Sequence, residues 1–170
     1  RLGLWEGLTI GEMVERTAAR RPEKVAVVFG DRRLRYQELI DQSRRLALGF
    51  VHAGLARGER VVLQLPNSIE FVLAYLALQW IGAVPVMALR PHRHSELRHF
   101  IRSSGAVAYI VRDVVSGFDF RDMAAQMQLE FPSLRWVAVV GRPGAGQRAL
   151  DAMVEGSLPA VVSVTAGGVE

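Results

Sequence analysis

Two kinds of apolar pattern alternate along the chain. Short runs of mainly apolar residues, rich in valine, occur at Val61–Leu65, Val84–Leu89, Val107–Val111 and Trp136–Val140. Such runs are typical of strands that are buried on both faces of a sheet. Segments of helical length separate them, at Ile69–Ile81, His94–Ser104 and Arg121–Phe131. The alternation predicts an α/β fold, a mostly parallel sheet flanked by helices with right-handed crossovers.

Two amphipathic helices are expected ahead of this region. Thr9 and Glu12 fit a capping box, in which each side chain accepts from the other residue's backbone N–H, so a helix is predicted over Ile10–Arg20. Apolar residues at helical spacing predict a second helix over Gln37–Ala53.

Turn signals delimit the remaining elements. Val25–Phe29 is followed by a Gly-Asp turn and by Leu34–Tyr36, so a small hairpin region is expected at about residues 24–36. Near the end of the sequence, a short helix is predicted over Arg148–Val154 and a further strand over Val161–Val164.

The segment Gly141–Gly146, here called the glycine-rich loop, follows a predicted strand, which is a suitable place for a phosphate-binding loop. Its sequence matches neither G-x-x-x-x-G-K-[ST] nor G-x-G-x-x-G. We therefore interpret it as a surface turn.

Composition narrows the classes of function. The 170 residues are 50% hydrophobic and 22% charged, which is typical of one globular domain. The net charge is +4, but the basic residues are dispersed among 17 acidic ones, which argues against nucleic-acid binding. Without cysteine, disulfides, thiolate zinc sites and thiol nucleophiles are excluded. No apolar run is long enough to span a membrane, so a soluble, cytoplasmic protein is expected.

Few polar residues have a spacing that indicates chemistry. His92, His94 and His99 lack a second ligand cluster at a definite spacing, so no metal site is predicted. Asn67 and Ser68 follow a predicted strand and precede a helix, where open α/β sheets bind ligands, but capping of the helix is sufficient to explain them and is the favoured interpretation.

Three aromatic residues, Phe71, Tyr75 and Trp80, lie on one apolar helix and are expected to belong to the core.

Five segments, in order, resemble motifs of the adenylate-forming enzyme superfamily. The resemblance begins at the helix and R-x-P-x-x-x-A-V layout of residues 9–28, and it continues through Leu34–Leu39 (motif L-[TS]-Y-x-E-L), Gly54–Val61, Leu65–Phe71 and Ala77–Val86. Arg35 departs from the Ser or Thr of the first of these core motifs. Consistency across five segments makes the resemblance specific.

Within the superfamily, Ala88–Leu97 and Ala106–Ile110 look most like the siderophore aryl acid enzymes, which activate 2,3-dihydroxybenzoate or salicylate. Arg90 and Pro91 depart from the Pro and small residue usual there. A fragment of an acyl-CoA synthetase or of a peptide-synthetase adenylation domain is the first alternative. A non-catalytic α/β interaction module is the second.

The resemblance implies that residues 1–170 are a single N-terminal α/β subdomain, part of the large domain of a longer ligase. Such enzymes use ATP and Mg²⁺ to form an acyl adenylate and then pass the acyl group to a carrier protein's phosphopantetheine thiol. The family's phosphate loop and C-terminal lysine have no counterpart among residues 1–170, so no catalytic, cofactor-binding or metal residue is assigned. His92 and Arg93 are the only candidates for substrate contact. The chain is expected to be inactive alone and to self-associate.

Overall fold

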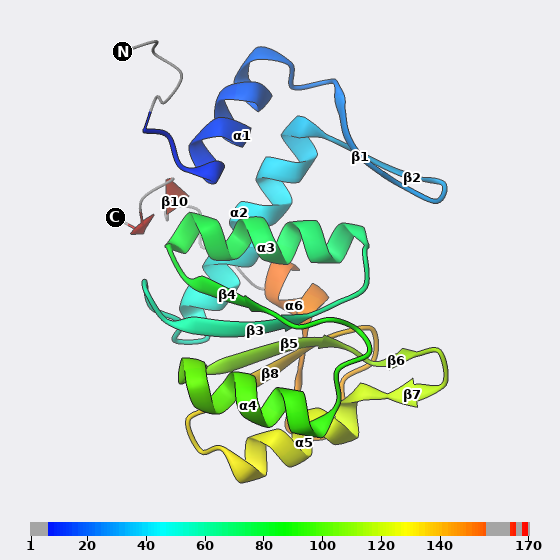
Figure 1. Cartoon of the computed structure of the whole chain (residues 1–170). Helices are drawn as coiled ribbons and strands as arrows, with labels where there is room; N and C mark the ends of the chain where they lie inside the picture. Colours follow the sequence, from blue (N-terminus) through cyan, green and yellow to red (C-terminus); the bar gives the residue numbers. More distant parts are fainter. Residues whose placement is uncertain (1–6, 156–163, 166–167, 170) are drawn as a thin grey trace.

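A computed structural model describes residues 7–155, 164–165 and 168–169 of the protein (Figure 1). Its centre is a five-stranded sheet whose neighbouring strands are all parallel. In the order β4-β3-β5-β8-β9, the strands are β4 (Val84–Met87), β3 (Arg60–Gln64), β5 (Ala108–Arg112), β8 (Trp136–Val140) and β9 (Arg148–Ala149). The predicted α/β class and parallel sheet are therefore confirmed.

Helices cover both faces of this sheet (Figure 1). One layer holds α2 (Tyr36–His52), α3 (Ile69–Ile81) and α6 (Leu150–Glu155), and the other holds α4 (His94–Ser104) and α5 (Phe120–Glu130). The first helix, α1 (Ile10–Arg20), packs on α2.

Alternate residues of each strand enter the two cores, because successive side chains of a strand point to opposite faces. In β3, Val61 and Leu63 belong to the core on the α2–α3 side, whereas Val62 belongs to the core on the α4–α5 side. Ile110 and Tyr109 of β5 divide in the same way. Burial on both faces explains why these segments read as continuous apolar runs.

The hairpin region contains β1 (Val25–Phe29) and β2 (Arg32–Arg35), paired antiparallel, and it projects from the body of the protein (Figure 1). The predicted hairpin is confirmed, but Tyr36 already begins α2. The capping box of α1 is also confirmed, since Glu12 N donates to Thr9 Oγ1 at 3.2 Å and Thr9 N donates to a Glu12 carboxylate oxygen at 2.6 Å.

Two parts of the chain differ from the expectation. A second hairpin, β6 (Val114–Val115) and β7 (Phe118–Asp119), was not predicted. Its turn places Ser116 at φ 51° and Gly117 at φ 77°, and a Ser-Gly pair is a turn signal that could have indicated it.

The last predicted helix begins at Leu150 instead of Arg148, because Arg148 and Ala149 add to the edge of the sheet as β9. Only Val164 of the predicted strand Val161–Val164 lies within the described residues, and it belongs to β10 (Val164–Thr165), which pairs antiparallel with β11 (Gly168–Val169). Within the described residues, no helix has both the length and the apolar character needed to cross a membrane.

Candidate functional site

A cleft of about 640 Å³ opens at the carboxyl ends of β3 and β4. This is the edge at which open parallel sheets bind ligands. The walls are mostly apolar and come from the hairpin, the β3–α3 connection and β4, with contributions from Phe29, Leu65, Phe71, Met87 and Leu89. Two polar residues, Asn67 and Arg90, share the lining.

The loop Leu89–Arg93 borders the cleft through its first residues. Hydrogen bonds from the buried side chain of Gln64, which is itself bonded to Tyr109, hold the loop in place. Gln64, the last residue of β3, donates from Nε2 to the carbonyls of Leu89 at 2.8 Å and His92 at 3.0 Å. Its Oε1 accepts from the hydroxyl of Tyr109, a fully buried residue of β5. Burial raises the pKa of Tyr109, so the phenol stays protonated and remains a donor.

His92 and Arg93, the two predicted candidates, take part in holding this loop. His92 Nδ1 accepts from Leu89 N at 3.0 Å, and the ring packs edge-on against Phe100. Arg93 donates to the carbonyl of Arg90 at 2.7 Å. Both side chains are half-buried and neither lines the cleft, so the contact of these two candidates with substrate stays a prediction.

The Arg93 guanidinium also lies over an aromatic pair beneath the loop. Its carbon is 4.0 Å from the ring centre of Phe118 and 5.1 Å from that of Phe120. A guanidinium stacks well on aromatic faces. The unpredicted β6–β7 hairpin, which carries Phe118, therefore helps to fix the β4–α4 loop.

Gln64 and Tyr109 were missed at the level of sequence. Each is a polar-tipped residue inside an otherwise apolar strand run, and that interruption is the signal that could have identified them. Buried polar groups require partners, so a glutamine within a buried strand indicates a specific hydrogen-bonded contact.

Asn67 and Ser68 have separate roles. Ser68 caps α3, because its hydroxyl accepts from Phe71 N at 3.2 Å, whereas Asn67 is exposed and lines the cleft. Trp80 is fully buried, as expected for the core, and Phe71 and Tyr75 are partly buried.

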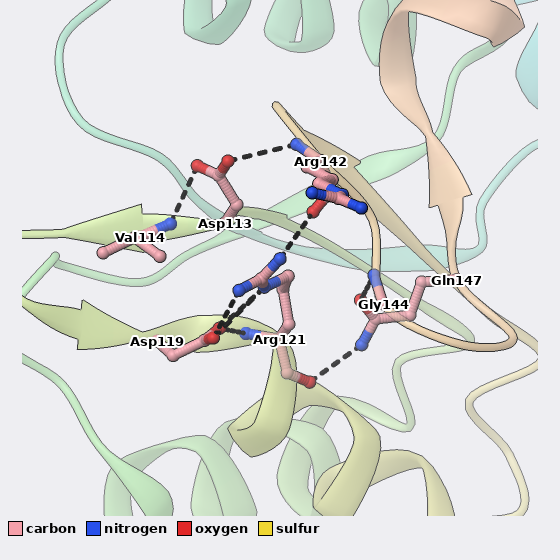
Figure 2. A network of polar contacts seen from close by, with 7 residues as sticks. All are labelled: Asp113, Val114, Asp119, Arg121, Arg142, Gly144 and Gln147. Atoms are coloured by element: carbon pink, nitrogen blue, oxygen red, sulfur yellow. Dashed lines mark hydrogen bonds and ion pairs between the residues drawn. The ribbon is translucent and has the colours of Figure 1, made fainter.

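The glycine-rich loop is a surface turn, and two of its backbone N–H groups donate to side chains of the protein itself (Figure 2). Arg142 N donates to the carboxylate of Asp113 at 3.0 Å, and Gly144 N donates to Gln147 Oε1 at 2.9 Å. Gln147 in turn donates to the carbonyl of Arg121 at 2.8 Å. A phosphate would have to displace these contacts and approach a carboxylate, so the loop does not fit a phosphate site.

The charge of Asp113, beside the glycine-rich loop, also argues against a phosphate site. Burial by itself would raise the pKa of Asp113, but hydrogen bonds from Arg142 N and Val114 N, with the charges of Arg112 and Arg121, outweigh it and hold that pKa below its ordinary value. Asp113 is therefore an anion at neutral pH and repels a second anion.

No metal centre emerges from the part of the chain that the structure describes, where no three His, Asp or Glu side chains lie close enough to hold an ion.

Comparison with known proteins identifies the family. The sequence profile of the AMP-binding enzyme family matches residues 14–156. The chain belongs to the AMP-binding enzyme family. Within that match lie the hairpin, all five strands of the sheet and the loop that carries His92 and Arg93.

Several members of this family are similar to the chain in sequence as well as in fold. The chain is 41% identical over 139 residues to a 2,3-dihydroxybenzoate-AMP ligase of Bacillus subtilis, with 82% of the chain and 26% of the relative covered. It is 43% identical over 147 residues to a salicyl-AMP ligase / salicyl-S-ArCP synthetase of Mycobacterium tuberculosis, with 84% and 26% covered. The apo structure of MbtA from Mycobacterium smegmatis superposes with a TM-score of 0.79 at 36% identity, over 92% of this chain and 29% of that one. The chain thus spans about a quarter of the length of these relatives.

Proposed function

We propose that these residues are the N-terminal α/β subdomain of an aryl acid adenylating enzyme of siderophore biosynthesis. The enzyme would join an aryl acid to ATP, release pyrophosphate and pass the aryl group from aryl-AMP to a carrier protein's phosphopantetheine thiol. Mg²⁺ bound with ATP and a cytoplasmic location belong to the same proposal.

The observation that carries the proposal is the identity of 41% and 43% to two ligases whose names specify 2,3-dihydroxybenzoate and salicylate. The Ala88–Leu97 segment, where the sequence resembles aryl acid enzymes, comprises the β4–α4 connection beside the cleft and the first turn of α4.

In this reaction the described residues act as a structural scaffold and do not carry out the chemistry. Their glycine-rich loop does not fit a phosphate, and a charge-stabilising site needs several preorganised donors. The sheet instead presents the ordered Leu89–Arg93 loop at the edge where ligands of parallel sheets bind.

A chimera tests the proposal. In the Bacillus subtilis ligase, the segment that aligns with this chain is replaced by the chain, and aryl acid-dependent ATP–pyrophosphate exchange is measured. We expect exchange within about tenfold of the parent, because a compatible scaffold preserves most of the transition-state stabilisation. The isolated 170-residue chain should show none above a no-protein control.

The matched control carries the corresponding segment of the long-chain fatty acid CoA ligase of Rhodopseudomonas palustris, which has the same fold at 19% identity to this chain. Equal exchange by both chimeras, or a folded chimera without exchange, would contradict the aryl acid assignment. Heat-sensitive exchange by the isolated chain would also contradict the scaffold role, and His92 and Arg93 would be the first residues to substitute.

A further inference from the structure

We propose that Gln64 and Tyr109 are positioning residues of the adenylation reaction. Gln64 holds the Leu89–Arg93 loop in the conformation that the reaction requires, and Tyr109 sets the orientation of the Gln64 amide. This rests on the proposed function and deepens it, since it names two residues that affect the activation of the aryl acid without touching a substrate. The loop belongs to Ala88–Leu97, the segment in which the sequence resembles aryl acid enzymes.

The amide of Gln64 fixes both ends of a short stretch of the loop. Both hydrogens of its Nε2 are used, because they are donated to the carbonyls of Leu89 at 2.8 Å and His92 at 3.0 Å. Between these two carbonyls lie Arg90 and Pro91, which border the cleft. One buried side chain at the end of β3 therefore sets the conformation of the loop at the edge of the sheet.

Tyr109 selects one of the two orientations of that amide. A glutamine amide that turns over exchanges its oxygen and its nitrogen, and a carbonyl oxygen can only accept. In the turned orientation Oε1 of Gln64 would face two carbonyl oxygens, and both loop contacts would be lost. Tyr109 pairs with Val62, two residues before Gln64, so the side chains of Tyr109 and Gln64 point to the same face of the sheet. The Tyr109 hydroxyl donates to Oε1 there and stabilises the orientation that holds the loop.

A kinetic signature distinguishes the positioning of the loop from general stability. A substrate that binds only the ordered loop has an apparent Kd equal to the intrinsic Kd divided by the fraction of enzyme with that loop ordered. Loss of the Gln64 or Tyr109 contact therefore raises KM, whereas kcat at saturating substrate is preserved. A general loss of stability lowers the concentration of folded enzyme instead, so the apparent kcat falls and KM stays the same.

The test measures ATP–pyrophosphate exchange by the chimera described above, with substitutions in the inserted chain. Tyr109→Phe removes only the hydroxyl that donates to Gln64. We expect the KM of the aryl acid to rise about fivefold to tenfold and kcat to change by less than about twofold. Gln64→Leu removes both bonds to the loop and should raise that KM by about tenfold or more.

Ser43→Ala is the matched control. Ser43 of α2 is fully buried and accepts from Trp80 Nε1 of α3 at 2.9 Å, in the helix layer on the other face of the sheet from α4. This substitution also removes a buried hydrogen bond, but it has no contact with the loop. The KM of the aryl acid should therefore stay within about twofold of that of the unsubstituted chimera.

Gln64→Glu separates hydrogen bonding from packing, because the side chain keeps its shape. A carboxylate cannot donate to the loop carbonyls, whereas a protonated carboxyl can donate to one of them. Burial raises the pKa of a carboxyl group, so the ratio of the variant's KM to that of the unsubstituted chimera should fall from about pH 8 to about pH 6. Taking the ratio at each pH removes the effect of the other titratable or charged groups around this side chain, which are His92, Arg93, Glu96 and Tyr109. The ratio for Gln64→Leu should not depend on pH.

A second measurement, on the isolated chain, needs no activity. Leu89 N donates to His92 Nδ1 at 3.0 Å, so the exchange of its hydrogen with water reports the order of the loop. The rate is measured by NMR on the ¹⁵N-labelled 170-residue chain, at a concentration where the chain is monomeric. We expect Tyr109→Phe to speed this exchange by about fivefold or more and Ser43→Ala to leave it unchanged.

The positioning role is overturned if Tyr109→Phe matches Ser43→Ala in KM or in the exchange of the Leu89 amide, if the variants lower kcat alone, or if the Gln64→Glu ratio does not vary with pH. An unsubstituted chimera without ATP–pyrophosphate exchange would contradict the proposed function and, with it, any part of this pair in that reaction. The amide measurement on the isolated chain tells the two failures apart, because it shows whether Tyr109 and Gln64 hold the loop.

Discussion

At the start of α2, Arg35 occupies the position that a hydroxyl residue takes in a capping box. Glu38 supplies half of the box by accepting from Arg35 N at 2.7 Å, but arginine has no acceptor to offer the first turn of the helix. The Ser or Thr usual in the L-[TS]-Y-x-E-L motif therefore has a structural explanation, as the other half of the box.

We predict that Arg35→Ser stabilises the protein by about 0.5–1 kcal/mol, the usual contribution of an N-cap hydroxyl. The variant also loses the ion pair with Glu23, which is exposed on both sides and contributes little. Urea unfolding measures the difference, and Arg33→Ser, an exposed substitution two residues earlier in the same strand, is the control. Equal effects of the two substitutions would show that the cap is unimportant.

Between elements, α2 packs closely against α6 at a glycine. Gly49 of α2 lies so close to α6 that an added Cβ would clash with the carbonyl oxygen of Met153. Because that atom belongs to the backbone, no side-chain rotation relieves the contact, and the two helices would have to separate.

Gly49→Ala therefore tests two opposed effects. Helix propensity alone favours alanine by about 1 kcal/mol. Overpacking costs about 1–3 kcal/mol, so we expect a net loss of up to about 2 kcal/mol in the free energy of unfolding. Arg45→Ala, on the exposed face of the same helix, should change stability by less than about 0.5 kcal/mol. A more stable Gly49→Ala variant would disprove the close contact.

Over the whole molecule, exposed apolar residues gather on two neighbouring elements. Val25, Val28 and Phe29 lie on β1, and Val84 and Met87 lie on β4, with exposed fractions of 41–58%. Phe29 and Met87 line the same cleft, so the two groups adjoin. Clustered apolar surface of this kind favours association.

We therefore predict that the isolated chain self-associates with increasing concentration, as sedimentation velocity would show. Val28→Thr combined with Met87→Thr should shift the onset to higher concentration. Leu129→Ser is the control. Leu129 is 85% exposed, but it lies on α5 and so belongs to neither β1 nor β4. A wild-type chain that stays monomeric at millimolar concentration, or a control with the same effect as the double variant, would contradict the prediction.

The sequence by itself determined the order and type of the main elements. Strands such as Trp136–Val140 are recognisable because burial on both faces demands an apolar run, and α1 is recognisable from the local capping pair Thr9 and Glu12. The motifs along residues 9–111 also indicated the family before any contact was known. These features depend on neighbours in the chain, so a linear pattern is sufficient to reveal them.

Tertiary structure decided the rest. The short strand β9 exists because Arg148 meets Ala138 of β8, and the cleft exists because the hairpin folds beside β4. Gln64 and Tyr109 lie 45 positions apart, and their contact becomes visible only when β3 and β5 pair in register. Such features depend on residues that are distant in the chain, and a buried hydrogen bond has no periodic signature, so only the assembled sheet specifies them.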